Sequence, residues 1–463
     1  MVSAMETQVA IVGAGPTGLA LACELRLHGI DCVVLERRVE EPNLTRAFAL
    51  HSRTMELLDG RGLAEEIVPC AIRATSVQPA PGVNLDLSVI ASRFNCVHVV
   101  PQSGTERVLE QRALATGARI RRGARVTGLT QDAAGVTLTL DGGEEVRALY
   151  VAGADGAHSV VRDLIGVDFA GTAYSTHIML ADVRLERPPV ETLFSARNEN
   201  GLVLFVPFGD GWFRAIAWDR TRENAPLDES LGLGELRESF FRISGDDYGM
   251  CQLRWSTRFL SEHKQARKYR VGRVFLAGDA AHVHSPVGGQ GMNTGIGDAF
   301  NLGWKLACAI EGVGPRDLLD TYESERHPVG ESVLQMTDAL YKIVMTNSKF
   351  GAWWRNAAIG AFVRFKPFAR RAAERISGIG IHYASGEHPL VGKRMAGVVD
   401  PQGRFTLLAP RPVNIEDVKG WVAAQSVRHK SFVLVRPDGY VAWAGDDAGD
   451  AERAVGRWCG ATP

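Results

Sequence analysis

The sequence predicts a mixed α/β protein with a discontinuous doubly wound domain, an inserted antiparallel sheet and a small terminal α/β unit. Three observations predict this architecture. First, residues 8–36 show an apolar strand, a glycine-rich turn, a helix and a second apolar strand, the pattern of a parallel unit with a right-handed crossover. Second, apolar residues alternate between 201 and 259, as in an antiparallel sheet. Third, a buried-strand pattern returns at 273–277 before a long helix.

The length indicates more than one domain. A chain of 463 residues corresponds to two or three domains of about 100–200 residues each. We expect the doubly wound domain to span 1–170 and 265–385. The inserted sheet would span 171–264 with part of 72–100, and residues 386–463 would form the terminal unit.

The composition excludes several classes of protein. Lys and Arg number 52 and Asp and Glu 53, giving a net charge of −1, whereas a general nucleic-acid binder needs a basic surplus. The hydrophobic fraction of 45% and the charged fraction of 23% are those of a globular chain. The 50 glycines, about 11% of the chain against a typical 7%, indicate many tight turns or close backbone approach to a ligand.

The cysteines and the apolar segments indicate the cellular compartment of the protein. The seven cysteines are scattered without a CxxC pair, so we expect no disulfide framework, no zinc site and no other metal. Residues 1–15 lack a charged region followed by a long apolar stretch, and charged residues interrupt the apolar segment 350–365. We therefore expect a cytoplasmic monomer or homodimer without a signal peptide or membrane span.

The elements of the doubly wound domain follow in order. The strand at 8–12 is a short apolar run, the helix at 19–28 has regular Leu and Ala spacing and stops at Gly29, and the strand at 32–35 ends in Glu36. Further along, the pattern predicts helix at 102–116, short strands within 119–140, strands at 149–152 and 273–277, a long helix at about 291–310 and mostly helix over 317–380.

The inserted sheet is rich in aromatic residues. We expect its strands at 201–206, 212–218 and 252–259. In the middle strand, a period of two places four residues on one face: Trp212, Arg214, Ile216 and Trp218. The aromatic residues of this region either form the core of the sheet or line a pocket for a planar substrate. The residues considered as pocket lining are Phe205, Trp212, Arg214 and Trp218.

A glycine-rich motif follows the first strand. In Gly13-x-Gly15-x-x-Gly18, the first glycine permits a tight turn, the second lets a pyrophosphate approach the backbone, and the third allows close packing of helix and strand. The helix N-terminus offers free N–H groups and partial positive charge to phosphates. Glu36 is placed to accept hydrogen bonds from a ribose diol. The motif predicts a Rossmann-type dinucleotide site without distinguishing NAD from FAD.

A second motif favours FAD. The strand at 273–277 ends in Gly278-Asp279, and an Asp at a strand's carboxyl end can accept hydrogen bonds from ribityl hydroxyls. The glycine-rich turn from Pro286 to Asn293 then enters a helix. Its N–H groups and positive end could face the flavin O2 and N1, where the reduced ring carries negative charge.

Two weaker patterns complete the set. Asp155-Gly156 follows a strand, with Arg162 a few residues on; a turn with a helix start explains this motif as well as a binding role does. His282 and His284 are separated by one residue, a spacing that suits packing or backbone hydrogen bonding better than a metal.

Together these motifs resemble the FAD-dependent aromatic hydroxylases, the para-hydroxybenzoate hydroxylase-like single-component monooxygenases. The resemblance covers about residues 7–345. It rests on four segments: VGAGPTGLALACELRLHGIDCVVLER, RAFALHSRTMELLDGRGL, GADGAHSVVR and RVFLAGDAAHVHSPVGGQGMNTGIGDAFNLGWKLA. Within the family the chain is most similar to bacterial polyketide hydroxylases and rifampicin monooxygenases, and SFVLVRPDGYVAW near its end resembles the close of their thioredoxin-like domain. Here that domain would be abbreviated and, without a thiol pair, redox-inert.

The resemblance implies a set of FAD contacts. Glu36 and Arg37 would serve the adenosine, Arg46 the cofactor through its guanidinium, Gln102 the ribityl chain, and Val126 the adenine through its backbone. Asp155 would serve FAD and passing NAD(P)H. The implied cofactor residues are Gly13, Gly15, Thr17, Gly18, Glu36, Arg37, Arg46, Gln102, Val126, Asp155, Asp279, Pro286, Gly291, Met292 and Asn293. One departure is Gly104, which is unfavourable early in a helix.

The implied reaction is oxygenation. NADPH or NADH would reduce the flavin, O2 would add at C4a, and the hydroperoxide would hydroxylate an aromatic, polyketide-type substrate, as in antibiotic biosynthesis. No protein base is named, because an ionised substrate phenol needs none. Three alternatives remain: Baeyer–Villiger insertion or antibiotic inactivation by the same chemistry; a flavin halogenase, whose GWxWxIP segment is not matched at residues 211–214; and a non-catalytic escort like the GDP-dissociation inhibitors, which would be expected to lose the cofactor motifs.

Overall fold

The structure is a computed structural model. It describes residues 5–40, 47–80, 83–191, 193–345, 365–383, 386–411, 420–426 and 430–460.

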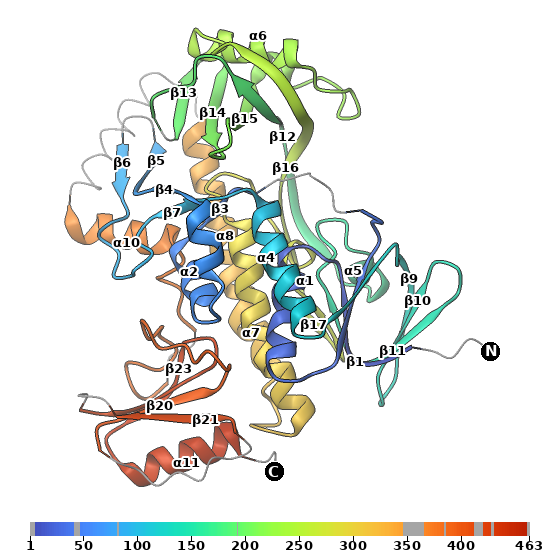
Figure 1. The fold of residues 1–463 in the computed structure, drawn as a ribbon, viewed down its shortest axis with the longest axis vertical. Helices are drawn as coiled ribbons and strands as arrows, with labels where there is room; N and C mark the ends of the chain where they lie inside the picture. Colours follow the sequence, from blue (N-terminus) through green and yellow to red (C-terminus); the bar gives the residue numbers. More distant parts are fainter. Residues whose placement is uncertain are drawn as a thin grey trace.

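A mixed eight-stranded sheet forms the centre of the first domain (Figure 1). Its strands run in the order β17-β18-β11-β1-β2-β8, with β10 and β9 added beside β11. The bounds are β1 (Met5–Val12), β2 (Cys32–Glu36), β8 (Arg119–Arg122), β9 (Val126–Gln131), β10 (Val136–Leu140), β11 (Glu145–Gly153), β17 (Arg270–Val271) and β18 (Val274–Leu276). The strands from β18 to β8 are parallel, as expected of a doubly wound domain.

The register brings four strand ends to one edge of this sheet. Val12 pairs with Leu35 on one side and with Gly153 on the other, and Gly153 pairs with Leu276. The segments after these strands therefore begin at the same level. They carry the three predicted motifs and Glu36, and the carboxyl edge of a parallel sheet is where such folds bind ligands.

Helices pack together beside this sheet. The helix α1 (Pro16–Leu27) packs against both α4 (Gln102–Ala115) and α7 (Gly291–Glu311), and α7 packs against α8 (Asp320–Met345). Helix α4 begins at Gln102 as predicted, and Gly104 lies within its first turn. The short α5 (Val160–Leu164) follows β11.

The inserted sheet has six antiparallel strands in the order β13-β14-β15-β12-β16-β19. Their bounds are β12 (Phe169–Leu185), β13 (Phe194–Asn198), β14 (Gly201–Pro207), β15 (Trp212–Asp219), β16 (Met250–Ala266) and β19 (His282–Val283). The helix α6 (Leu233–Ser244) covers one face, at the top of Figure 1. The sequence patterns did not reveal β12 or α6. The expected boundaries at 170/171 and 264/265 fall within strands, near the start of β12 and near the end of β16.

Smaller elements complete the fold. They are β3 (Ala49–Leu50), α2 (Ser52–Asp59), α3 (Ala64–Ile67), η1 (Val68–Cys70), β4 (Ile72–Ala74), β5 (Ser76–Ala80), β6 (Val83–Asp86), β7 (Val97–Val99), η2 (Arg220–Arg222), η3 (Gly278–Ala280) and α10 (Lys366–Ile376). Strands β3, β7 and β4 form one sheet, and β5 pairs with β6.

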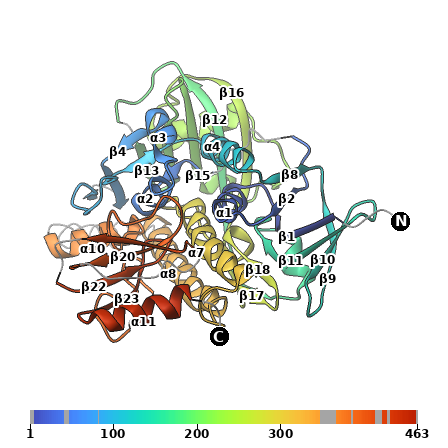
Figure 2. The same ribbon diagram turned by 60° about the horizontal axis from the view of Figure 1, so that its bottom comes forward.

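The C-terminal unit, residues 386–460 as far as they are described, is a four-stranded sheet with one helix lying along it (Figure 2). The strand order is β21-β20-β22-β23, with β20 and β21 parallel. The bounds are β20 (Phe405–Ala409), β21 (Val422–Ser426), β22 (Phe432–Val435), β23 (Val441–Gly445) and α11 (Ala448–Cys459). Cys459 is fully buried. Apolar residues of this unit belong to the same core as the first domain, and Trp304 of α7 meets Phe405 at 5.4 Å.

His28 joins the C-terminal unit to α1. Its ring stacks on Trp421 at 4.5 Å, both rings line a cavity of about 380 Å³, and its Nε2 is buried without a hydrogen-bond partner among the described residues. Burial and the positive charge of Arg61 lower the pKa of His28 to about 3. Since this folded pKa lies below the ordinary value, acid favours the unfolded chain.

The expected result is a loss of stability between pH 7.5 and 5.5. The unfolded state binds a proton at His28 near pH 6.5 and the folded state does not. Protonation of His28 in the unfolded chain therefore lowers the free energy of unfolding by up to about 1.4 kcal/mol at pH 5.5. A His28→Phe variant keeps an aromatic ring against Trp421 and should lose less stability over the same range. Chemical denaturation of both proteins at the two pH values measures the difference, and identical pH dependence would contradict the assignment.

Candidate functional site

The three glycines of the first motif have different surroundings. Gly13 has φ +107°, and a Cβ there would lie 2.4 Å from the carbonyl oxygen of Ala154. A Cβ on Gly18 would lie 2.0 Å from the carbonyl oxygen of Gly13. Gly15, the N-cap of α1, has no heavy atom within 4 Å of that position. The structure therefore needs Gly13 and Gly18 for its own packing, whereas Gly15 leaves open space at the helix N-terminus.

Thr17 brings the first two motifs together. A Cβ on Gly278 would lie 2.5 Å from Thr17 Oγ1, and a Cβ on Gly295 would lie 2.2 Å from the same atom. Gly278 also has φ +62°, in the left-handed region that favours glycine. Two glycines of the second segment thus make room for one side chain of the first, and α1 lies directly beside the start of α7.

Asp279 lies at the junction of β18 and α7. Its side chain is exposed, and its Oδ1 is 3.7 Å from the position of a Cβ on Gly291, where α7 begins. The first N–H groups of an α-helix have no partner within the helix, so Gly291, Met292 and Asn293 present backbone donors at this point. A carboxylate and a helix N-terminus therefore lie side by side, as the sequence predicted. Pro286 is exposed in the loop before them.

Hydrogen bonds to the backbone of the segment 49–51, and to the His51 ring, hold this loop. The Asn293 side chain accepts from the His51 N–H at 2.8 Å and donates to the carbonyl oxygens of Ala49 and Gly289, each at 2.8 Å. His51 Nε2 lies 2.9 Å from the Gly288 carbonyl oxygen, which requires a proton on that nitrogen. Burial lowers the pKa of His51, so the ring is neutral.

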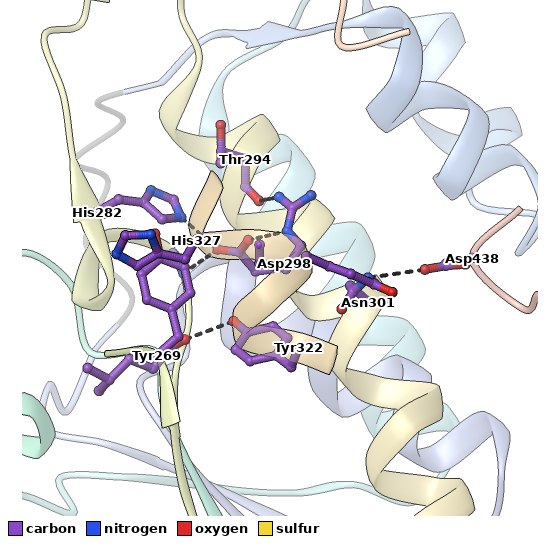
Figure 3. A network of polar contacts seen from close by, with 12 residues as sticks. Tyr269, His282, Thr294, Asp298, Asn301, Tyr322, His327 and Asp438 are labelled. Carbon is purple, nitrogen blue, oxygen red and sulfur yellow. Dashed lines mark hydrogen bonds and ion pairs between the residues drawn. The ribbon is translucent and has the colours of Figure 1, made fainter. Parts of the chain in front are cut away.

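Asp298 fixes the turn that precedes Asp279. It is fully buried and accepts from the Gly278 N–H at 2.9 Å, from His282 Nε2 at 2.7 Å and from Arg326 Nε at 2.7 Å (Figure 3). Although burial opposes ionisation, Arg326 and His282 hold the pKa of Asp298 below its usual value. His282 therefore serves hydrogen bonding in the interior.

Glu36 is buried at the end of β2. Its Oε2 accepts from the Ala14 N–H at 2.9 Å, and its Oε1 accepts from the backbone and the side chain of Arg38 at 3.0 and 2.8 Å. Although burial raises the pKa of Glu36, these hydrogen bonds lower it more. Glu36 is therefore an ionised acceptor beside the glycine-rich turn. Arg37 is exposed next to it.

Two of the remaining predicted contacts have local surroundings that the structure describes. Gln102 accepts from the Ala47 N–H at 3.0 Å and donates to Glu106 at 2.8 Å. Val126 begins β9, and the Ala124 N–H just before it donates to the Glu36 carbonyl oxygen at 2.9 Å. Arg46 lies outside the described residues.

Asp155 points into its own segment. Its Oδ1 accepts from Ser159 Oγ at 2.5 Å and its Oδ2 from the Val161 N–H at 3.1 Å, so the carboxylate closes the start of α5. Arg162 continues the link by donating to the Ala280 carbonyl oxygen at 3.1 Å. The side chain thus has the local role of a turn and helix start, and its role toward a cofactor stays a prediction.

The four residues considered as pocket lining have separate surroundings. Phe205 pairs with Ala215 across the sheet and stacks on Phe240 of α6 at 4.4 Å. It therefore belongs to the core beneath α6, on the opposite face from Arg214, and we correct the expectation that it lines a pocket. The error arose because α6 was not seen in the sequence.

Arg214 and the two tryptophans do share a face, as the period of two predicted. Arg214 Nε lies 2.6 Å from Asp182 Oδ1, with both side chains buried. Trp212 lies beneath Arg254, with its ring centroid 4.3 Å from the guanidinium carbon. Trp218 donates to Glu223 at 3.1 Å. The Asp182 carboxylate thus balances the charge of Arg214 inside the sheet. No sequence pattern indicated this pair, because β12 was not recognised.

These observations fit a dinucleotide ligand that carries a chain of hydroxyl groups. An open glycine cradle lies at the N-terminus of α1, an ionised buried Glu36 follows the next strand, and an exposed Asp279 lies beside the start of α7. Anionic phosphates suit the first feature and hydroxyl groups suit the two carboxylates. The fold and the site therefore define a dinucleotide-binding protein of the doubly wound class with a second, antiparallel domain.

Comparisons with known proteins give the family. A model described as FAD binding domain matches residues 6–337, and one described as aromatic-ring hydroxylase, C-terminal, matches 388–462. A rifampicin monooxygenase from Streptomyces venezuelae is 38% identical over 98% of each chain. The solved structure of an anhydrotetracycline hydroxylase from Streptomyces rimosus matches with TM-score 0.87 and 34% identity, over 99% of this chain and 100% of that chain. The chain belongs to the FAD-dependent aromatic-ring hydroxylases, which are monooxygenases.

The family confirms the resemblance drawn from the motifs, including the similarity to polyketide hydroxylases and rifampicin monooxygenases. An aromatic hydroxylase from angucycline biosynthesis also matches, with TM-score 0.84 and 35% identity over 99% of this chain and 100% of that chain. Among the described residues, no helix combines the length and apolar character needed to cross a membrane.

Proposed function

We propose that the protein hydroxylates an aromatic, polyketide-type substrate with NAD(P)H and O2, using FAD bound along the carboxyl edge of the eight-stranded sheet. The observation that carries the proposal is the convergence of Gly15, Glu36 and Asp279 on that edge. Bound FAD would supply the oxygen-activating chemistry. The protein would hold it through the cradle at α1, the acceptors Glu36 and Asp279, and the donors at the start of α7.

The backbone N–H groups of Met292 and Asn293 would stabilise negative charge on the flavin. They lie at the N-terminus of a 21-residue helix, whose dipole places partial positive charge there. The hydrogen bonds of Asn293 and His51 fix these donors in place before any ligand binds. We retain the other implied contacts, Thr17, Arg37, Arg46, Gln102, Val126 and Asp155, as part of this proposal, together with the domain boundaries given above.

The substrate would be large, planar and weakly charged. Arg214 lies on the same face as the tryptophans, and Asp182 balances its charge, which argues against Arg214 as a dedicated clamp for a small aromatic acid. Trp212 and Trp218 share that face. The similarity to enzymes named for rifampicin and anhydrotetracycline supports a polyketide-type ligand.

Oxidation that inactivates an antibiotic is the second candidate, favoured by the 38% identity to the rifampicin monooxygenase. Mass spectrometry of products from a panel of aromatic polyketides and rifamycins, with NADPH and with NADH, separates the two. Addition of one oxygen to an aromatic ring supports hydroxylation. Oxidation of rifamycins alone, or insertion of an oxygen atom into a ring, supports the second candidate.

NAD(P)H would bind transiently at the surface. Only one GxGxxG motif is present in the chain, and we assign it to FAD. Substrate-free oxidation of NAD(P)H should then be slow, since substrate would be needed to bring the flavin to the reductant. Stopped-flow reduction with and without substrate measures this, and fast uncoupled oxidation would contradict it.

An Asp279→Ala variant is expected to bind FAD roughly ten- to a hundredfold more weakly. The reason is the loss of charged hydrogen bonds worth about 1.5–3 kcal/mol. Titration of the apoprotein with FAD, followed by flavin fluorescence, gives the dissociation constant. An unchanged constant would mean that the flavin lies elsewhere. Asp163→Ala is a matched control, since that exposed carboxylate lies in α5.

A further inference from the structure

The C-terminal unit contacts the first domain through buried polar groups. Asp438, in the turn between β22 and β23, is buried and accepts from Asn301 of α7 at 3.3 Å. Its carbonyl oxygen accepts from Arg53 of α2 at 2.5 Å. Arg436 lies beside it and donates to both Asp438 and Glu325. Breaking one partner of such a buried pair costs far more than breaking an exposed one, so this interface is strongly specified.

Two consecutive residues of α8 connect this interface to the flavin turn. Glu325 accepts from Arg436 at 2.6 Å and from Lys305 at 2.8 Å. Arg326, the next residue, donates to Asp298 at 2.7 Å and to the Thr294 carbonyl oxygen at 3.0 Å. Figure 3 shows Asp298 at the centre of this network, with Asn301 and Asp438 at its far side. One turn of α8 therefore faces both regions.

An aromatic pair provides a second connection. Tyr440 of the C-terminal unit lies against Tyr383 with ring centroids 4.3 Å apart. The Tyr383 hydroxyl oxygen accepts from Arg326 Nη1 at 3.3 Å. Arg326 is buried, and its partners Asp298 and Tyr383 belong to different parts of the chain. The guanidinium therefore contacts Asp298 of α7 directly and the C-terminal unit indirectly, through the packing of Tyr383 on Tyr440.

Asp298 completes the path. Besides Arg326, it accepts the Gly278 N–H at 2.9 Å, and Gly278 directly precedes Asp279. A shift of the Arg326 guanidinium would move the carboxylate that holds this turn. Asp279 would then change its position relative to Gly291, where the proposed flavin contacts converge.

We propose that the C-terminal unit is a positioning element of the FAD site, acting through Tyr440, Tyr383, Arg326 and Asp298 on the Gly278–Asp279 turn. The proposal rests on the proposed function, because it takes FAD to bind at Asp279. It gives the unit a mechanical role in place of the thiol chemistry of thioredoxin, for which it lacks a CxxC pair. Spatial continuity does not by itself establish coupling, so the experiment measures coupling directly.

The experiment uses the full-length apoprotein and titrates it with FAD. Tyr440→Leu removes the ring against Tyr383, Tyr383→Phe removes only the hydroxyl that meets Arg326, and the double variant combines them. We expect the FAD dissociation constant to rise about tenfold for Tyr440→Leu and about threefold for Tyr383→Phe. The double variant should bind no more weakly than Tyr440→Leu, since both changes interrupt one path.

The matched control is Val433→Ala in β22. Val433 is buried in a separate apolar cluster of the same unit, so its truncation loosens the unit without touching the network. Thermal unfolding of each apoprotein accompanies the titrations. We expect Val433→Ala to lower the unfolding midpoint while leaving the FAD dissociation constant within twofold of the wild type.

Three results would overturn the inference: an equal loss of FAD affinity in Val433→Ala, unchanged affinity in both tyrosine variants, or fully additive effects in the double variant. If Tyr440→Leu does not fold, Tyr383→Phe, which lacks one oxygen atom, carries the test alone. Asp279→Ala in the same titration separates the two proposals. If it leaves FAD binding unchanged, the proposed function fails; if it alone weakens binding, only the positioning role fails.

Discussion

A Gly15→Val variant is expected to fold normally and to purify without FAD. Gly15 has φ −82° and ψ −179°, an extended conformation that valine adopts readily and that suits a residue before proline. No heavy atom lies within 4 Å of the added Cβ, so the apoprotein has room for it. The same space is where the pyrophosphate of the proposed cofactor would approach the N-terminus of α1.

The expected loss of FAD affinity is at least a hundredfold, equivalent to about 2.7 kcal/mol. Flavin absorbance per protein and an FAD titration measure it, and thermal unfolding of the apoprotein checks the fold. Gly18→Ala is the contrasting variant. Its Cβ would lie 2.0 Å from the Gly13 carbonyl oxygen, so it should lower stability even without FAD. A Gly15→Val protein with full flavin content would place the cofactor elsewhere.

The second large effect is expected at Arg214. Replacing it with Met leaves Asp182 buried and without its charged partner, which costs about 3–5 kcal/mol. The double variant Arg214→Met with Asp182→Leu removes both charges and should recover most of that stability. Chemical denaturation of the wild type, the two single variants and the double variant gives the coupling energy.

The same variants test the choice of substrate. If Arg214 serves the fold through Asp182, the double variant should retain binding of a neutral polyketide. A folded double variant that specifically loses binding of a small aromatic acid would show that Arg214 is an anion clamp, and the proposed substrate class would then be wrong.

The sequence predicts well that the motifs meet at one edge of the sheet, because the determinants are local. Gly13, Gly15 and Gly18 lie within six residues and act on one turn, and Glu36 follows the next strand directly. The strand pattern then requires these segments to meet at one edge, and the pairing of Val12 with Leu35 shows that they do. The helix beginning at Gly291 was likewise predicted at its observed start.

Pairings between distant segments could not be predicted in the same way. Arg214 and Asp182 lie 32 residues apart on strands whose register no local pattern records. The Asn293 side chain pairs with the backbone near His51, 242 residues away. Phe205 was considered both as core and as pocket lining, because alternation identifies a face without telling which face a helix covers. The polar residue Asp298 inside an apolar helix could have indicated a buried partner, but the sequence analysis did not single it out.

Thr17 fits between Gly278 and Gly295, and this contact has a consequence for biosynthesis. One half of the proposed FAD site is translated within the first 40 residues, but the other half is made only after more than 270. A nascent chain therefore cannot hold the cofactor while its N-terminal strands emerge from the ribosome, since the glycines that receive Thr17 do not yet exist. At the proposed site, flavin uptake would therefore follow the synthesis of α7.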